Sequence, residues 1–226
     1  IFRLGTVLDE LKCTAFLTSE SNNGSPFDVE DFISDGIITL NYIQGEQAMI
    51  RHINVPKMRG INYRSGEIMF EIDSRGITVY PKIPVERKVA KTDFQERKET
   101  GVKGLDEMLE GGYPKGHVVL ISGNTGTGKS TLGMRFLSEG IENGEKAIFV
   151  NLEESKTQIE KTAKVRGIDV KKYQEEGNLK LISPDLIDMY PDKLLNNILN
   201  AVDEMDADRL LIDSVSSIPS ADISKD

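Results

Sequence analysis

The sequence predicts an α/β fold in which a parallel central sheet is flanked by helices. Apolar β-branched runs alternate with segments whose apolar residues recur at helical spacing, which is typical of parallel sheets covered by helices on both faces. The strand predicted at residues 117–121 leads into a glycine-rich loop, and a helix is predicted directly after that loop. Residues 37–80 predict a separate β-hairpin region with additional short strands.

The glycine-rich loop has the pattern G-x-x-x-x-G-K-[ST], which marks a phosphate-binding loop when it joins a strand to a helix. Glycines let backbone N–H groups curl around a phosphate, and the helix N-terminus adds a partial positive charge. We expect Lys129 to reach the β- and γ-phosphates of ATP and Ser130 to hold Mg²⁺. An ordinary glycine-rich turn is the alternative, and the strand–loop–helix context favours nucleotide. The predicted nucleotide contacts are Gly123, Asn124, Thr125, Gly126, Thr127, Gly128, Lys129, Ser130 and Thr131.

Carboxylates follow two of the predicted strands. Asp213 ends the strand at residues 209–213 and resembles a Walker B aspartate, which orients Mg²⁺ or its water ligands. Glu153 and Glu154 end the strand after the loop, at the sheet edge where open α/β folds bind ligands. A carboxylate there can polarise an attacking water, although acidic residues are also favoured at helix N-termini. We expect one of the pair to be catalytic, and the sequence does not select which.

The remaining elements follow from local patterns. In the first part of the chain we expect an exposed linker over residues 81–100, which hold prolines and many charges. Pro56 is expected to end the pairing of the hairpin. The predicted strands are 14–17, 37–43, 48–55, 68–72, 77–80, 147–152 and 179–183, and the predicted helices are 1–12, 27–34, 104–109, 155–166 and 193–205.

Composition limits the possible functions. The 226 residues include 28 Lys and Arg against 37 Asp and Glu, a net charge of −9, which argues against loose binding to nucleic acid. Cys13 is the only cysteine, so an internal disulfide is impossible and a reducing cytoplasm is expected. The sequence contains neither a signal peptide nor an apolar run near the roughly 20 residues of a membrane span. Because it opens on Ile1 rather than methionine, we expect a fragment of a longer chain.

Several motifs together resemble the KaiC-like branch of the RecA/RadA ATPases. They are the stretch 101–109 with Gly111-Gly112, the phosphate loop, the paired glutamates and Ile212-Asp213-Ser214. The first part of the chain is similar to the carboxyl-terminal half of a KaiC domain, through residues 17–20, 34–38 and Lys57-Met58-Arg59-Gly60. The resemblance implies a RecA-like P-loop NTPase core. It also implies a domain order of 1–80 as the second half of one ATPase domain, 81–100 as linker, and 101–226 as the P-loop half of another. A permuted single domain is the alternative.

The resemblance also implies a function. It implies an ATPase that forms homo-hexameric rings with ATP and Mg²⁺ between subunits, in a regulatory or signalling role with an unknown downstream protein. Lys57 and Arg59, expected on a loop, correspond to the basic pair that reaches the γ-phosphate of the neighbouring subunit. The family's sheet order predicts that residues 14–17, from this chain or a neighbour, lie between the strands 118–121 and 210–212.

Three other functions remain open at this stage. A recombinase or helicase motor shares the core but needs basic loops for DNA. An ATP-dependent scaffold would bind ATP without turnover. An autokinase would carry phosphate on serines such as Ser19, Ser21, Ser25 or Ser34. The clock protein of the KaiC family phosphorylates an adjacent Ser and Thr, and the matching positions here are Asp31 and Phe32.

Overall fold

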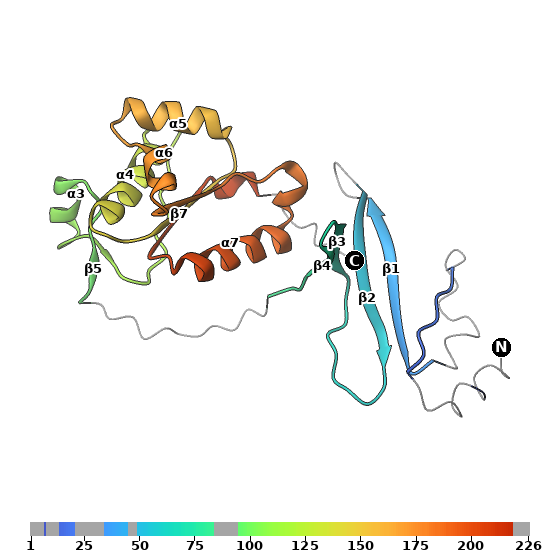
Figure 1. The fold of residues 1–226 in the computed structure, drawn as a ribbon. Helices are drawn as coiled ribbons and strands as arrows, with labels where there is room; N and C mark the ends of the chain where they lie inside the picture. The colour runs from blue at the N-terminus through green and yellow to red at the C-terminus, as the bar shows by residue number, and fades with distance from the viewer. Residues whose placement is uncertain (1–6, 8–13, 21–33, 45–48, 84–94, 219–226) are drawn as a thin grey trace. The chain divides into compact units, whose positions relative to one another are not determined.

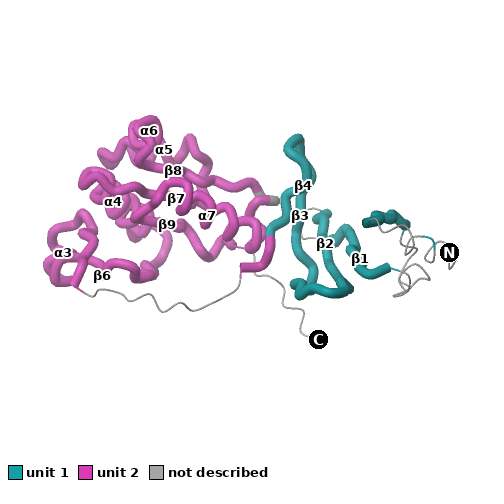
Figure 2. The backbone as a smooth tube through the Cα atoms, turned by 60° about the horizontal axis from the view of Figure 1, so that its bottom comes forward, with its two compact units in different colours: residues 1–80 teal, residues 81–226 magenta. Residues whose placement is uncertain are grey.

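A computed structural model describes residues 7, 14–20, 34–44, 49–83 and 95–218 of the chain. It divides the chain into two compact units, residues 1–80 and 81–226 (Figure 2). The helices predicted at residues 1–12 and 27–34 lie outside the described residues, apart from the helical Val7 and from Ser34.

The first unit contains a four-stranded antiparallel sheet in the order β1-β2-β3-β4. Its strands are β1 (Gly36–Gln44), β2 (Met49–Met58), β3 (Ile68–Asp73) and β4 (Gly76–Tyr80), which confirms the predicted hairpin region. The expected stop at Pro56 is wrong, because the pairing continues to Met58 opposite Gly36. The register shifts between Ile37 and Thr39, so Pro56 lies in a β-bulge, where a residue without an N–H group is tolerated.

Two predicted strands are not formed. Residues 14–20 have no regular secondary structure, and Phe16 is 86% exposed. Residues 117–121 are likewise irregular, with Val118 100% and Leu120 82% exposed. An apolar β-branched run shows only that its side chains favour a strand. A strand also needs a neighbouring backbone that completes its hydrogen bonds. Residues 14–17 are therefore not a strand in this structure, and their insertion between residues 118–121 and 210–212 remains a prediction.

The second unit is an α/β fold around a three-stranded parallel sheet, as predicted (Figure 1). The order is β8 (Leu179–Ile182), β7 (Ala147–Asn151) and β9 (Arg209–Asp213), and both pairs are parallel. The helices are α3 (Lys103–Met108), α4 (Lys129–Glu142), α5 (Lys156–Val165), α6 (Val170–Glu175) and α7 (Pro191–Met205). Short 3₁₀ turns lie at Leu186–Met189 and Val215–Ser217.

The central strand β7 contributes to two hydrophobic cores. All five of its residues are buried, as expected for a parallel strand with helices over both faces. Ala147 and Phe149 pack with α4, α5 and α6, whereas Ile148 and Val150 pack with α7. Alternation along one strand thus builds both layers, and it places the end of β7 where two neighbouring strands also end.

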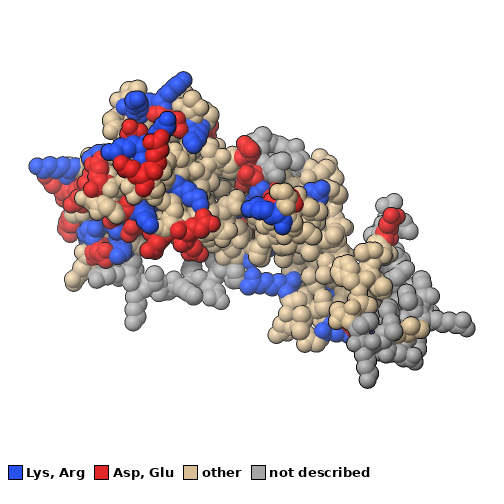
Figure 3. Space-filling model, in the orientation of Figure 1, with Lys and Arg blue, Asp and Glu red and all other residues tan. Residues whose placement is uncertain are grey.

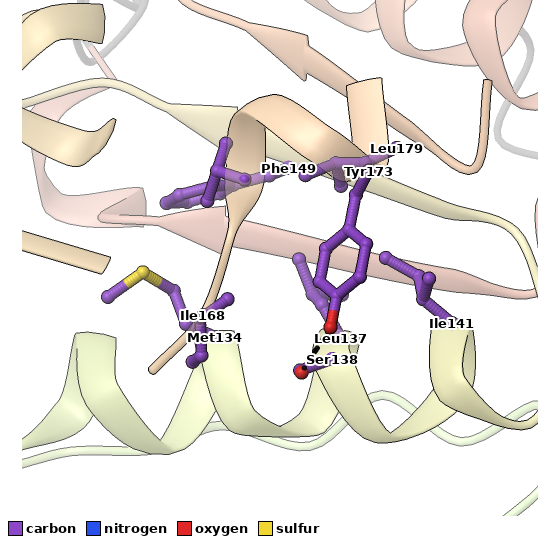
Figure 4. A pocket seen from close by; sticks show the side chains of 9 residues that line it. Met134, Leu137, Ser138, Ile141, Phe149, Ile168, Tyr173 and Leu179 are labelled. Carbon is purple, nitrogen blue, oxygen red and sulfur yellow. Dashed lines mark hydrogen bonds between the residues drawn. The ribbon is translucent and has the colours of Figure 1, made fainter. Parts of the chain in front are cut away.

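The core beneath α4 contains a cavity of only about 10 Å³ (Figure 4). In the close-up, Met134, Leu137 and Ile141 extend from α4 towards the side of the pocket on which Phe149 and Leu179 lie. The hydroxyls of Ser138 and Tyr173 lie 3.0 Å apart at its margin. This volume is close to the minimum for one water molecule, so the cavity is a packing defect rather than a ligand site.

Local sequence patterns did not predict α6 or a short antiparallel ladder before the phosphate loop. The ladder pairs β5 (Arg97–Lys98) with β6 (Tyr113–Pro114). Thr100 is fully buried beside it, and its N–H donates to Asp106. The exposed linker predicted for residues 81–100 is therefore too long at its carboxyl end, because residues 97–100 belong to the fold of the second unit.

Candidate nucleotide-binding and catalytic site

The loop before α4 is shaped by glycines and by hydrogen bonds within the loop. Gly126 and Gly128 have φ angles of +83° and +96°, which side chains with a Cβ rarely adopt. A Cβ on Gly123 would lie 2.7 Å from the Thr127 hydroxyl, which itself donates to the Asn124 carbonyl at 2.8 Å. The sequence pattern therefore corresponds to a tight turn that leads into α4.

Lys129, the first residue of α4, curls back over this loop. Its ammonium group donates to the carbonyls of Gly123 at 2.9 Å and Asn124 at 3.1 Å. Ser130 lies beside it in the exposed first turn. No side chain caps the start of α4, so its first N–H groups are available to an anion.

Packing brings the start of α4 to the carboxyl end of β9. A Cβ added to Gly133 would lie 2.6 Å from Leu211, so the helix approaches the strand closely at this point. Gly133 is one turn beyond Lys129, and Leu211 is two residues before Asp213. The phosphate loop and Asp213 therefore lie at the same edge of the sheet.

Strand pairing brings the glutamate pair to Asp213. Asn151, the last residue of β7, is the register partner of Asp213, and the N–H of Leu152 donates to the Asp213 carbonyl at 2.8 Å. The Asn151 side chain then closes the turn, accepting the Glu154 N–H and donating to the Glu154 carbonyl. Asn151 thus fixes the backbone that carries both glutamates.

The side chain of Glu153 is held by serines that follow β9. Its Oε1 accepts the Ser214 hydroxyl at 2.5 Å and the Ser217 hydroxyl at 3.1 Å. The hydroxyls of Ser214 and Ser216 are 2.6 Å apart. For Glu154, the structure gives hydrogen bonds of the main chain only, within the described residues. The two adjacent glutamates therefore differ in how they are held.

The predicted basic pair lies in the first unit. The expected loop position is wrong for Lys57, which is the penultimate residue of β2. Arg59 follows the strand. The Lys57 ammonium donates to the Ser34 carbonyl at 2.7 Å. The exposed Arg59 pairs with Asp35 at 3.1 Å, and its N–H donates to the Asp35 carbonyl. The segment before β1 thus holds both basic residues at the end of the hairpin.

The side chains present fit a magnesium ion that binds together with a nucleotide. Mg²⁺ commonly takes one or two protein ligands and fills its remaining positions with phosphate oxygens and water. Ser130 and Asp213 provide such oxygens at the shared sheet edge. Among the described residues, no group of three His, Cys, Asp or Glu side chains is placed to hold a metal alone. In the same part of the chain, no helix has the length and apolar character that a membrane span requires.

Two features of the site were missed in the sequence. Asn151 gave no signal beyond its position at the end of an apolar strand. Ser217 gave none either, because its contact with Glu153 joins residues 64 apart in sequence. Only the adjacency of Ser214 to Asp213 pointed towards this turn.

A glycine-rich phosphate loop that leads into a helix at the carboxyl edge of a parallel sheet, with an aspartate ending one strand of that sheet, defines a P-loop NTPase of the RecA-like class. A family model described as "ATPase: KaiC" matches residues 1–83 and 98–226. The chain belongs to this ATPase family.

Curated relatives match nearly the whole chain. It is 34% identical over 228 aligned residues to the circadian clock oscillator protein KaiC of Picosynechococcus sp., and 34% to KaiC 1 of Synechocystis sp.. It is 30% identical to the circadian clock protein KaiC3 of Synechocystis sp.. These alignments cover 96% of the chain but only 42–44% of the relatives. The chain therefore spans less than half the length of the relatives it matches.

Proposed function

We propose that this chain binds ATP with Mg²⁺ at residues 123–131 and hydrolyses it as part of a regulatory, KaiC-type ring ATPase. The observation that carries the proposal is the meeting of the phosphate loop, Asp213 and the anchored Glu153 at one sheet edge. The names of the relatives refer to circadian clocks, which supports a regulatory or signalling role. In this proposal residues 1–80 and 101–226 are halves of two successive ATPase domains.

Each predicted residue has a role in this reaction. Lys129 and the N–H groups of the loop neutralise the β- and γ-phosphates. Ser130 and Asp213 would hold Mg²⁺, which would supply positive charge that stabilises the charge developing on the phosphates. A glutamate of the 153–154 pair orients the water that attacks the γ-phosphorus. The same glutamate takes up the proton that this water loses. The bond from the γ-phosphorus to the bridging oxygen breaks, and ADP leaves with that electron pair.

Steady-state hydrolysis by the full chain tests this proposal. We expect Mg²⁺-dependent release of phosphate from ATP that Glu153→Gln or Glu154→Gln reduces by at least about 10-fold. Glu175→Gln is a matched control on the exposed face of α6. Single-stranded DNA should leave the rate unchanged, since acidic and basic side chains are intermixed on the face of the second unit in Figure 3. Stimulation by DNA would favour a nucleic-acid motor, and ATP binding without turnover would favour a scaffold.

We further propose that Lys57 and Arg59 act in trans, on ATP held by a neighbouring subunit of a ring. Charge spreads over the γ-phosphate oxygens during phosphoryl transfer, and a second cation stabilises it. An arginine supplied in trans is worth roughly 10³–10⁵ in rate in GTPases, and a smaller factor is expected here because Lys57 shares the task. Asp35 has to release or reorient Arg59 for this role, since the two are paired.

A mixing experiment tests the action in trans. Arg59→Ala should slow hydrolysis while changing ATP affinity little, and Lys129→Ala should abolish binding at its own site. A mixture of the two variants should recover part of the lost activity, because some interfaces then pair an intact loop with an intact Arg59. If rings form and the mixture is no more active than its components, Arg59 does not act in trans.

A further inference from the structure

The structure describes both Glu153 and Glu154, and within the described residues only the carboxylate of Glu153 is anchored by hydrogen bonds. Two serine hydroxyls converge on Oε1, from residues 61 and 64 positions further along the chain. Within the described residues, Oε2 of Glu153 accepts no hydrogen bond. One oxygen of this carboxylate is therefore fixed and the other is left to act on a ligand.

The local fold explains why two serines reach the same oxygen. The 3₁₀ turn at Val215–Ser217 has three residues per turn, so side chains three positions apart lie one above the other. Ser214 and Ser217 have this spacing. The parallel pairing of Asn151 with Asp213 then sets the start of the turn beside Glu153.

The hydroxyls are not needed to build the turn. Its backbone closes independently, because the N–H of Ser217 donates to the Ser214 carbonyl at 3.1 Å. Glu153 is exposed, so solvent would satisfy its carboxylate without serines. Fixing an exposed, flexible side chain costs conformational entropy, and a long-range contact that does so suggests a demand for orientation.

We infer that Ser214 and Ser217 are positioning residues that orient Glu153 as the base of the reaction, an inference that rests on the ATP hydrolysis proposed above. They hold Oε1, while Oε2 takes the proton of the water that attacks the γ-phosphorus. The inference selects Glu153 over Glu154, whose given contacts, within the described residues, hold only its main chain. Ser216 supports Ser214 through its hydroxyl contact.

Kinetics of serine variants of the full chain test this inference. Ser214→Ala combined with Ser217→Ala should lower kcat about 10-fold, with KM and ATP affinity within about 2-fold of wild type. Ser217→Ala alone should cost less than Ser214→Ala, because its hydrogen bond is longer. Ser214→Thr should keep most activity, since the extended backbone of Ser214 suits a β-branched residue and the hydroxyl is retained. Ser74→Ala, in the exposed β3–β4 turn, is the matched control.

A second background separates orientation from a structural role. When Glu153→Gln is already present, removing both serines should cause no additional loss of kcat, because they act through that carboxylate. An equal loss in both backgrounds, or an unchanged kcat in the double serine variant, would overturn the inference while hydrolysis itself stands. If the wild type does not hydrolyse ATP, the proposed function is refuted, and the serine roles with it. If Glu153→Gln retains the wild-type kcat, Glu153 is not the base, and the serine roles are refuted.

Discussion

The two ends of β9 both carry charged residues, but they are built in opposite ways. At its start, Arg209 is a buried side chain, only 2% exposed, bonded to the Glu145 carboxylate and to the carbonyls of Glu99 and Phe136. Its guanidinium also stacks 4.4 Å from the centre of the Phe136 ring. At its other end, Asp213 and the neighbouring glutamates lie at a partly open edge.

The difference lies in how far each charge is already satisfied. Lys98 completes the Arg209 cluster by donating to Glu145 at 2.6 Å, and Gly140 leaves space where a Cβ would contact the guanidinium. In this cluster the charged groups are paired with one another and with main-chain carbonyls of the same fold, so the cluster stabilises the fold. The opposite end keeps carboxylate oxygens and helix N–H groups available. Charge therefore marks a candidate site only where its partners are incomplete.

The largest expected effect comes from breaking the closed cluster. Arg209→Ala leaves a partly buried carboxylate short of its main partner, and loss of one member of a buried pair typically costs about 3–5 kcal/mol. Chemical denaturation should show this decrease in the unfolding free energy of the full chain. Arg166→Ala, which removes a solvent-exposed arginine at the end of α5, should change stability by no more than about 0.5 kcal/mol. Equal effects in both variants would remove the distinction between the two ends.

The complementary change is Lys129→Ala at the open end. We expect ATP affinity to fall by about 100-fold or more, equivalent to about 2.7 kcal/mol, because the main cation on the phosphates is lost. Stability should change little, since Lys129 bonds only to exposed loop carbonyls among the described residues. Titration with a fluorescent ATP analogue and a denaturation curve measure both quantities. Unchanged affinity would show that the nucleotide site lies elsewhere.

A smaller effect should appear as a pH dependence of the closed cluster. Burial raises the pKa of Glu145, but hydrogen bonds from Arg209 and Lys98 outweigh it and leave the pKa below its ordinary value of 4.5. A depressed pKa contributes stability above the unfolded-state value, and that stability is lost as pH falls through the folded-state value. The stability difference between wild type and Glu145→Gln should therefore be largest near neutral pH and shrink below about pH 4.5. A difference that is constant with pH would contradict this assignment.

The smallest effect is expected from an exposed ion pair that also joins distant residues. Lys180 of β8 contacts Glu204 of α7 at 2.7 Å, yet their side chains are 40% and 68% exposed. Lys180→Ala should cost at most about 1 kcal/mol in the same denaturation assay, because solvent screens such pairs. A cost as large as that of Arg209→Ala would show that burial is not what separates the two kinds of cluster.

Local patterns predicted most of the second unit. The strands β7, β8 and β9 and the helices α4, α5 and α7 each combine an apolar pattern with a glycine or charged stop nearby. The short helix α6 was missed although Asp169 caps it, with its side chain accepting the N–H of Lys172. Its single turn and a half gave too little periodicity to separate it from a loop.

The failures share a physical cause, which is dependence on distant partners. Residues 117–121 have the composition of a strand, but no strand among the described residues pairs with them. Nothing in the run at 209–213 indicated that Arg209 is buried, because Glu145 and Glu99 lie 64 and 110 positions away. In the site, the phosphate loop and Asp213 were recognisable from spacing, whereas the contacts of Glu153 depend on the folded register.

The position of Lys129 determines which hydrogen bonds an anion must replace at the proposed nucleotide site. Its ammonium group already donates hydrogen bonds to two carbonyls of the loop, so an incoming anion has to compete with these bonds. A polyphosphate offers several charged oxygens to the lysine and to the helix N–H groups together, and it can outcompete neutral carbonyls. In the proposed nucleotide site, Lys129 therefore exchanges two neutral partners for charged phosphate oxygens when ATP binds.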